Sequence, residues 1–127
     1  MLLDTHSLLW FLNNDRKLPS SVKERIETTE FVFFSMSSIW EIALKVNIGK
    51  LTLLTSIEMM QLNLINLNIQ EIPITFEDAA TYTSLPINPD HRDPFDRMLV
   101  AQAIHRSLPL VSKDEDLDFY QIQRIWK

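Results

Sequence analysis

The amino-acid sequence contains no cysteine, only one glycine and no long apolar run. The absence of cysteine excludes a disulfide framework and a thiolate metal site, and it is typical of proteins from a reducing cytoplasm. A single glycine, Gly49, excludes the glycine-rich loops that bind phosphate groups. No apolar run approaches the roughly 18 residues that span a bilayer, and the first residues, Met1–Asp4, lack the basic region of a secretory signal. We therefore expect a cytoplasmic protein without a membrane partner.

Basic residues are scarce relative to acidic ones. The chain has 12 Lys and Arg against 17 Asp and Glu, which gives a formal net charge of −5. This balance argues against a broad basic surface that binds nucleic acid through phosphate contacts alone. A nucleic-acid substrate would need a local device, such as bound cations. The length of 127 residues and the 46% share of hydrophobic residues fit one globular domain over residues 1–127 with a single core.

Short apolar runs alternate with helix-like patterns along the chain. We expect buried strands near residues 1–4, 31–35, 69–73, 108–112 and 122–126, with helices between them. This alternation predicts an α/β fold, a three-layer α/β/α sandwich around a mostly parallel sheet of about five strands. In such a fold, ligands gather beyond the carboxyl ends of the strands, where the winding of the chain reverses.

Several polar residues have a structural explanation as helix caps. Asp93 and Pro94 fit the first positions of a helix that is apolar on nearly every side until His105, so this helix should be buried. Gly49 fits a left-handed residue that ends the helix entered from residues 31–35. Residues 18–24 predict a helix start in which Ser21 and Glu24 are spaced as a capping box, and a further helix opens at Met36, where Ser38 and Glu41 have the same spacing.

Four acidic residues share one edge of the expected sheet, although each has an alternative explanation as a cap. Asp4 follows the first strand, and Asp114 follows the fourth. Asp96 begins the buried helix, and Glu41 lies in the helix that the second strand enters. Carboxylates at close range raise one another's pKa unless a cation neutralises them. Because the chain has no cysteine and no paired histidines, such a site suits Mg²⁺ or Mn²⁺ better than Zn²⁺.

One or two such ions activate a water molecule and stabilise the displacement at a phosphodiester, which favours a metal-dependent nuclease over a glycosidase. Two alternatives stay open. One is another Mg²⁺-dependent phosphoryl-transfer enzyme, although a phosphatase with an aspartate nucleophile needs a second acid where this chain has His6. The other is a binding module of the same fold whose acids only cap helices and which cleaves nothing.

Three motifs resemble the PIN domain in their order and spacing, and specifically the VapC-type ribonuclease toxins of bacterial toxin–antitoxin pairs. They are Leu3-Asp4-Thr5-His6, then Ser38–Lys45 with Gly49–Leu51, and then His91–Arg97 with Ala101–Ala103. The resemblance covers essentially the whole chain. It implies about five parallel strands and a divalent-metal endoribonuclease active on structured RNA, often transfer RNA. It also implies a homodimer, and inhibition by a cognate antitoxin whose tail enters the cleft.

The resemblance also implies roles for individual acids. Asp4, Glu41 and Asp96 match the first three acids of the family. Asp114 matches the fourth best, although Asp116, two residues later, is an alternative. On this basis Asp4 and Asp96 bind the principal metal ion, while Glu41 and Asp114 act directly or through water.

Further polar residues are weaker candidates. Asp93 is an additional acid near the site that would bind through water. Thr5, assisted by Ser7, matches the polar residue that follows the family's first acid, and both are candidates for contacts with the substrate. The basic residues that we consider for contacts with RNA phosphates are Lys45, Arg92 and Arg97. Each of these three has the alternative role of a surface charge that balances nearby acids.

The remaining residues of note are aromatic or aliphatic. His6 and His91 are interpreted as structural, because metal-activated water requires no histidine base. Trp40 and Leu44 lie on a second apolar stripe of their helix, so we place them at a dimer or antitoxin contact and not at the chemistry.

Overall fold

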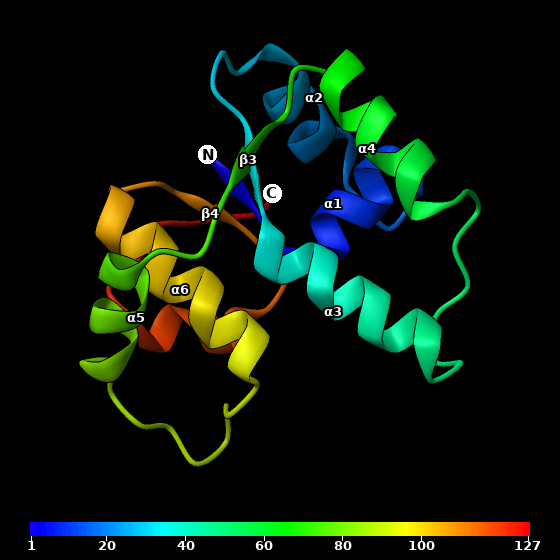
Figure 1. Ribbon diagram of the computed structural model, residues 1–127. Coiled ribbons are helices and arrows are strands. Elements are labelled where there is room, and N and C mark those ends of the chain that lie inside the picture. Colours follow the sequence, from blue (N-terminus) through cyan, green and yellow to red (C-terminus); the bar gives the residue numbers. More distant parts are fainter.

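A five-stranded parallel sheet forms the centre of the protein (Figure 1). The computed structural model describes residues 1–127. The strands are β1 (Leu2–Leu3), β2 (Phe33–Ser35), β3 (Gln70–Ile72), β4 (Leu110–Val111) and β5 (Arg124–Ile125). Their order is β3-β2-β1-β4-β5. The chain therefore winds outward from β1 to β3 and then returns to the other side of β1, so the winding reverses between β1 and β4.

Helices connect the strands and cover both faces of the sheet. They are α1 (Thr5–Leu12), α2 (Ser20–Thr28), α3 (Met36–Asn47), α4 (Ile57–Asn66), α5 (Phe76–Thr83) and α6 (Pro94–Arg106), with a short 3₁₀ helix η1 (Glu115–Phe119). None of these helices is both long enough and apolar enough to cross a membrane.

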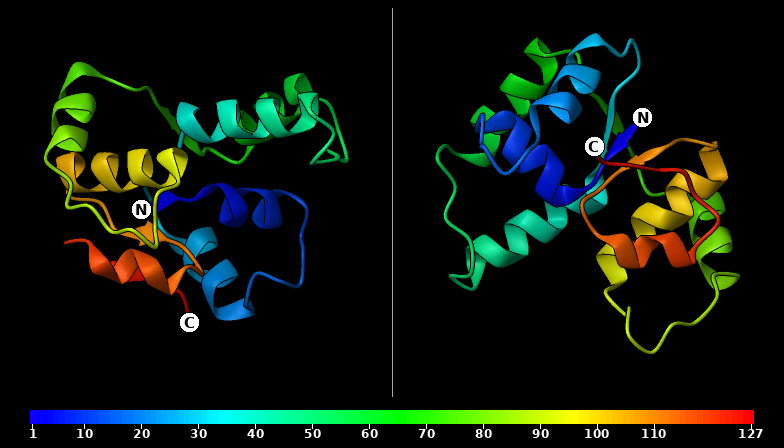
Figure 2. Two further views of the ribbon diagram at one scale, coloured as in Figure 1. Left: turned by 90° about the horizontal axis from the view of Figure 1, so that it is seen from below. Right: turned by 180° about the vertical axis from the view of Figure 1, so that it is seen from behind.

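Adjacent strand residues point to opposite faces, which divides the core in two. Leu3 and Val111 join one buried cluster together with residues of α1, α2 and α4. Leu2 and Leu110 join the other, which is formed largely by α6 and also includes Leu117 of η1. Figure 2 shows α1, α2 and α4 on one side of the strands and α5 and α6 on the other. This arrangement confirms the predicted three-layer α/β/α sandwich, and its sheet is entirely parallel.

The helix α6 begins and ends as the sequence predicts. The carboxylate of Asp93 accepts hydrogen bonds from the backbone N–H groups of Phe95 and Asp96, and Pro94 occupies the first turn, where its missing N–H leaves no bond unmade. The residues from Leu99 to Ala103 are buried. At the other end Ser107 adopts a left-handed conformation with φ 53°. The buried helix therefore starts beside the sheet edge at which the acids were expected.

Both predicted capping boxes are wrong. The residue before α2 is Pro19, which makes no side-chain cap, and the helix already includes Ser21. The helix α3 follows β2 without a loop, so its cap is Ser35, whose hydroxyl accepts from the backbone N–H of Ser37. Ser38 and Glu41 consequently lie inside the helix, and Glu41 is free to make contacts outside its own helix. Gly49 does have the expected left-handed conformation, with φ 77°.

Candidate functional site

Asp4 stands where the central strand β1 turns into α1. Its Oδ1 accepts a hydrogen bond from the backbone N–H of Ser7 at 2.8 Å, which confirms its role as a helix cap. Only 7% of the residue is exposed. Burial raises the pKa of this carboxyl above its ordinary value, while hydrogen bonds from Ser112 and Ser7 act in the opposite direction. Capping thus uses only one of the two carboxylate oxygens of Asp4.

Glu41 reaches the same region from α3, and two neighbours fix its side chain. Oε1 accepts from the hydroxyl of Thr5 at 2.7 Å, and Oε2 accepts from Nζ of Lys45 at 2.8 Å. The hydroxyl of Thr5 also lies 2.9 Å from Oγ of Ser38. Glu41 is only 4% exposed. Its bond with Lys45 raises the pKa of that amine, so the buried carboxylate has a permanent counter-charge.

Asp96, in the first turn of α6, has a strongly raised pKa. Burial and then the negative charges of Asp93, Asp4, Glu41 and Asp114 raise the pKa of Asp96 to about 7. Like charges act in this way only when they face the same small volume. The four acids predicted from the sequence are therefore electrostatically coupled.

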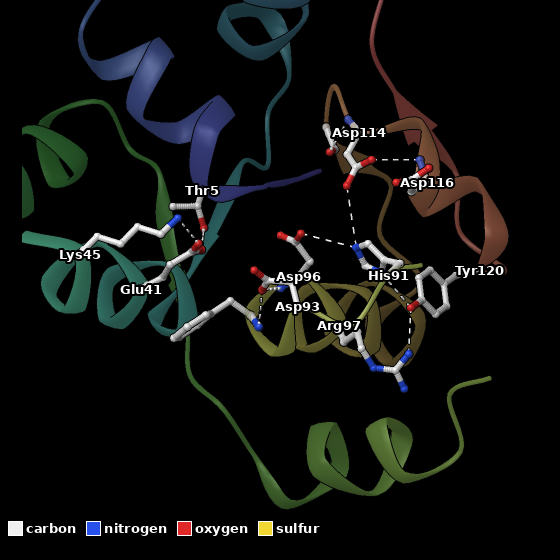
Figure 3. Close-up of polar contacts among 12 residues, drawn as sticks. Thr5, Glu41, Lys45, His91, Asp93, Asp96, Arg97, Asp114, Asp116 and Tyr120 are labelled. Atoms are coloured by element: carbon white, nitrogen blue, oxygen red, sulfur yellow. Dashed lines mark hydrogen bonds and ion pairs between the residues drawn. The ribbon is translucent and has the colours of Figure 1, made fainter. Parts of the chain in front are cut away.

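Asp4, Asp96 and Asp114 line one cleft of about 510 Å³. The other residues that line it are His6, Trp10, Lys113, Glu115 and Asp116. Asp114 caps η1 by accepting from the backbone N–H of Asp116 at 3.0 Å. Glu41 does not line this cleft itself but adjoins it from α3, as Figure 3 shows.

Asp114 is better placed than Asp116 to act together with Asp96. Ligand atoms of His91, Asp96 and Asp114 all lie within 4.8 Å of one another, whereas Asp116 is exposed at the rim. Figure 3 shows these three side chains turned toward a common point. The geometry therefore favours Asp114 over Asp116, and its role as the fourth acid stays a prediction.

His91 is the residue of this site that the sequence did not identify. It is 6% exposed, with Nδ1 at 3.0 Å from Oη of Tyr120. Its Nε2 lies 3.5 Å from Oδ2 of Asp96 and 3.8 Å from Oδ2 of Asp114. No local pattern indicates these contacts, because Tyr120 and Asp114 follow much later in the chain. The only signal was its place two residues before the cap of α6.

Three residues that were candidates for substrate contacts lie inside the protein. Ser7 is fully buried, and its hydroxyl donates to the carbonyl of Val111 at 3.2 Å. Thr5 is 6% exposed and binds Glu41. Arg97 is 7% exposed and donates to the carbonyl of Pro86. Each of these three side chains is engaged in an internal contact, and its role in binding RNA stays a prediction.

The two other basic candidates remain at the surface. Arg92 is exposed, directly after His91. The side chain of Lys45 is 37% exposed, but its amine pairs with Glu41. Lys113, which the sequence did not single out, is exposed and lines the cleft.

The side chains of the cleft fit a hard divalent cation. The available ligands are carboxylate oxygens from four separate elements of the fold, and the chain has no thiolate. Oxygen ligands of this kind suit Mg²⁺ and Mn²⁺. A bound cation would also remove the repulsion that raises the pKa of Asp96, so the electrostatics and the ligand chemistry agree.

Comparisons with known proteins bear on the whole chain. The model of the PIN domain family matches residues 1–125. Among solved structures, VapBC2 from Rickettsia felis bound to a promoter DNA fragment superposes with a TM-score of 0.65 at 16% identity, over 99% of this chain and 98% of that chain. No curated protein matches the sequence.

Two further solved structures show the same fold. DNA-bound VapBC from Salmonella typhimurium has a TM-score of 0.61 at 16% identity, and FitAcB from Neisseria gonorrhoeae has 0.62 at 18%. In both cases the match covers 98% of this chain and 95% of the other. At these identities the likeness establishes the architecture, while the chemistry depends on the residues of the cleft.

Proposed function

Since the chain belongs to the PIN domain family, we propose that it is a divalent-metal-dependent endoribonuclease and the toxin of a toxin–antitoxin pair. Residues 1–127 then form a single PIN-like domain. The observation that carries the proposal is the convergence of Asp4, Glu41, Asp96 and Asp114 from four elements, with the pKa of Asp96 raised to about 7 by burial and by the other acids. Such an arrangement stabilises the fold poorly unless it binds a cation.

The four acids would hold Mg²⁺ or Mn²⁺, with Asp4 and Asp96 as the principal ligands. Glu41 and Asp114 act directly or through water, while Asp93 and Asp116 are further acids at the margin of the site. When bound, the cation supplies an activated water molecule and a positive charge at the phosphodiester.

The chain's own side chains keep the carboxylates ready for this role. Thr5 and Lys45 hold both oxygens of Glu41, and the backbone N–H of Ser7 holds one oxygen of Asp4. Ligands that are fixed before the cation arrives lose little conformational freedom on binding, so a preorganised site binds more tightly.

RNA is the substrate that we propose, and transfer RNA is one candidate. Because the protein carries a net charge of −5, phosphate groups must be drawn in by the cation and by local basic residues. Arg92 and Lys113 are exposed beside the acids, and Lys113 lines the cleft. These two residues, both more exposed than Arg97, are further candidates for phosphate contacts.

A protein partner is also part of the proposal. The structural neighbours from Rickettsia felis and Salmonella typhimurium are VapBC complexes, and we propose a cognate antitoxin and a homodimer for this chain. Trp40 is 62% exposed and meets the ring of Phe95 edge-on at 5.3 Å, beside an apolar pocket of about 350 Å³. With Leu44, 37% exposed on the same helix, this surface suits a contact with the antitoxin or a second copy.

Cleavage of RNA by the Asp96→Asn variant tests the function. Wild-type protein should cut structured RNA in the presence of Mg²⁺ or Mn²⁺ and lose this activity with a chelator. Asp96→Asn should abolish cleavage while it leaves the fold intact. Asp90→Asn, which changes an exposed acid in the preceding loop, is the matched control and should cut normally. Full activity in Asp96→Asn would refute the assignment, and no cleavage by the wild type would favour a non-catalytic binding module or a different phosphoryl-transfer activity.

A further inference from the structure

His91 is buried, with only 6% of the residue exposed, and yet one nitrogen of its imidazole has no hydrogen-bond partner. This nitrogen, Nε2, faces the carboxylates of Asp96 and Asp114 at 3.5 and 3.8 Å (Figure 3). A buried polar atom without a partner is unfavourable and usually has a functional reason. Two reasons are conceivable: Nε2 carries a lone pair that binds a metal, or it carries a proton that is directed at the carboxylates.

The hydrogen bonds at Nδ1, on the other side of the imidazole ring, decide whether Nε2 carries a lone pair or a proton. Nη1 of Arg97 donates to Oη of Tyr120 at 2.9 Å, and a guanidinium can only donate. The hydroxyl of Tyr120 then has one proton left, and its other polar partner is Nδ1 of His91 at 3.0 Å. Tyr120 therefore donates to Nδ1, so neutral His91 carries its proton on Nε2.

Packing holds this chain of hydrogen bonds in place. Tyr120 is 4% exposed, and its ring meets the imidazole edge-on at 5.6 Å between centroids. The guanidinium of Arg97 lies 5.3 Å from the ring centroid of Tyr82 and donates to the carbonyl of Pro86 at 3.0 Å. Arg97 therefore has little freedom to release Tyr120, and Tyr120 has no other acceptor to turn to.

We propose that His91 is a positioning residue whose Nε2–H orients the carboxylates of Asp96 and Asp114 and which does not itself bind the cation. The distances of 3.5 and 3.8 Å exceed a hydrogen bond, so in this structure the N–H acts on both carboxylates through electrostatic attraction. Residues that contact the ligands of a metal ion without binding the ion themselves tune the affinity of the site for the metal in this way. The consequence is a site with oxygen ligands only, which favours Mg²⁺ and Mn²⁺ over Zn²⁺. The inference rests on the proposed function for the identity of the cation.

Nitrogen NMR of the metal-free protein tests the tautomer directly. Long-range ¹H–¹⁵N correlations of His91, recorded at a pH where its ring is neutral, should show the proton on Nε2 and a lone pair on Nδ1. Tyr120→Phe removes the hydroxyl that fixes Nδ1, so it should produce a mixture of the two tautomers. A proton on Nδ1 in the wild type would make Nε2 an available ligand and overturn the proposal.

Two substitutions of His91 separate positioning from packing. The amide nitrogen of His91→Gln stands near the place of Nε2 and keeps a donor toward the carboxylates. The amide of His91→Asn stands near the place of Nδ1 and keeps only the contact with Tyr120. In titration calorimetry with Mn²⁺, the Asn variant should lose about 10- to 100-fold in affinity, as is usual when such a supporting residue is removed. The Gln variant should retain most of the affinity, while both unfold at similar temperatures. Equal Mn²⁺ affinities in the two variants would overturn the proposal.

The same measurements distinguish a failure of this inference from a failure of the proposed function. If the tautomer and the Mn²⁺ affinities are as expected but RNA remains uncut, the positioning role stands and the nuclease assignment fails. If RNA is cut in a manner that depends on Asp96 while both His91 variants bind Mn²⁺ equally, the nuclease assignment stands and the positioning role fails.

Discussion

Asp96 is the residue whose charge depends most on its neighbours. Its pKa of about 7 in the folded protein compares with 3.8 for an unperturbed aspartate. At a pH between these two values, Asp96 is protonated in the folded state and ionised in the unfolded state. The stability that Asp96 contributes is therefore fully present below about pH 4 and is lost as the pH rises to about 7.

This pH dependence predicts that Asp96→Asn stabilises the metal-free protein at neutral pH. The variant removes a carboxylate that burial and four like charges disfavour, so its advantage over the wild type should grow from pH 4 to pH 7. One pKa unit corresponds to about 1.4 kcal/mol, so the gain should reach a few kcal/mol at most. Urea unfolding with a chelator at each pH measures it, and parallel stability curves for the two proteins would contradict the shift.

Thr5 offers a second prediction at this scale. The substitution Thr5→Val keeps the shape of the side chain but leaves Oε1 of Glu41 without its donor. Leaving a buried acceptor unpaired costs about 1–3 kcal/mol, and loss of a supporting contact should reduce RNA cleavage about 10- to 100-fold. Thermal unfolding and a cleavage assay read the two effects. The control is Thr28→Val at an exposed helical position, which should change neither; normal cleavage by Thr5→Val would show that Glu41 needs no support.

Residues whose partners lie nearby in the sequence were predictable, and residues with distant partners were not. Asp4 and Asp93 were recognised as caps because a cap bonds to N–H groups two or three residues later. Arg97 was assigned to RNA because its spacing says nothing about Tyr120, which follows 23 residues later. The contacts of His91 with Tyr120 and Asp114 were not predictable for the same reason.

Among the elements of the fold, strands and buried helices were the most predictable. Each expected strand contains an observed strand. The observed strands are shorter than the expected ones because only two or three residues of each apolar run pair with a neighbouring strand. The helix α3 begins at Met36, as expected, but its cap is Ser35 and not Ser38, because β2 passes into the helix without a loop. The local pattern of Ser38 and Glu41 matched a capping box, but tertiary contacts with Thr5 and Lys45 determine what Glu41 binds.

The first turn of α6 permits a prediction that separates capping from charge. Asp93 caps the helix through two backbone N–H groups, and its negative charge contributes to the raised pKa of Asp96. Asp93→Asn keeps a good cap and removes the charge, whereas Asp93→Ala removes both. The Ala variant should be less stable than the Asn variant by about 1 kcal/mol.

The carboxyl of Asp96 reports the charge effect independently. Its pKa, followed by NMR of the metal-free protein, should fall in both variants because both lose the same neighbouring charge. Urea unfolding supplies the stabilities. If the Asn and Ala variants were equally stable, the hydrogen bonds from Phe95 and Asp96 to Asp93 would not contribute to the helix.

At the scale of the whole molecule, the strand order explains why distant acids meet. The reversal of winding at β1 and β4 places the loops after these two strands side by side, and those loops carry Asp4 and Asp114. The acids of α3 and α6 approach the same edge. The alternation of strands and helices predicted such an edge and singled out four of the 17 acids in the chain as its neighbours, and the resemblance to the PIN domain then suggested a role for each.

The last prediction concerns the stability of the whole protein in the presence of metal. A ligand that binds only the folded state stabilises it by mass action, by about 2.7 kcal/mol at a concentration one hundred times its Kd. Mn²⁺ should therefore raise the unfolding temperature of the wild type by several degrees and bring down the pKa of Asp96, because the cation balances the clustered acids.

Asp4→Asn should show little of this rise in unfolding temperature, whereas Asp118→Asn, which alters an acid that pairs with Arg124 outside the cleft, should show all of it. Scanning calorimetry over a Mn²⁺ series makes the comparison. An equal shift in all three proteins would mean that the cation binds elsewhere, and the clustered acids would then have to be explained by helix capping alone.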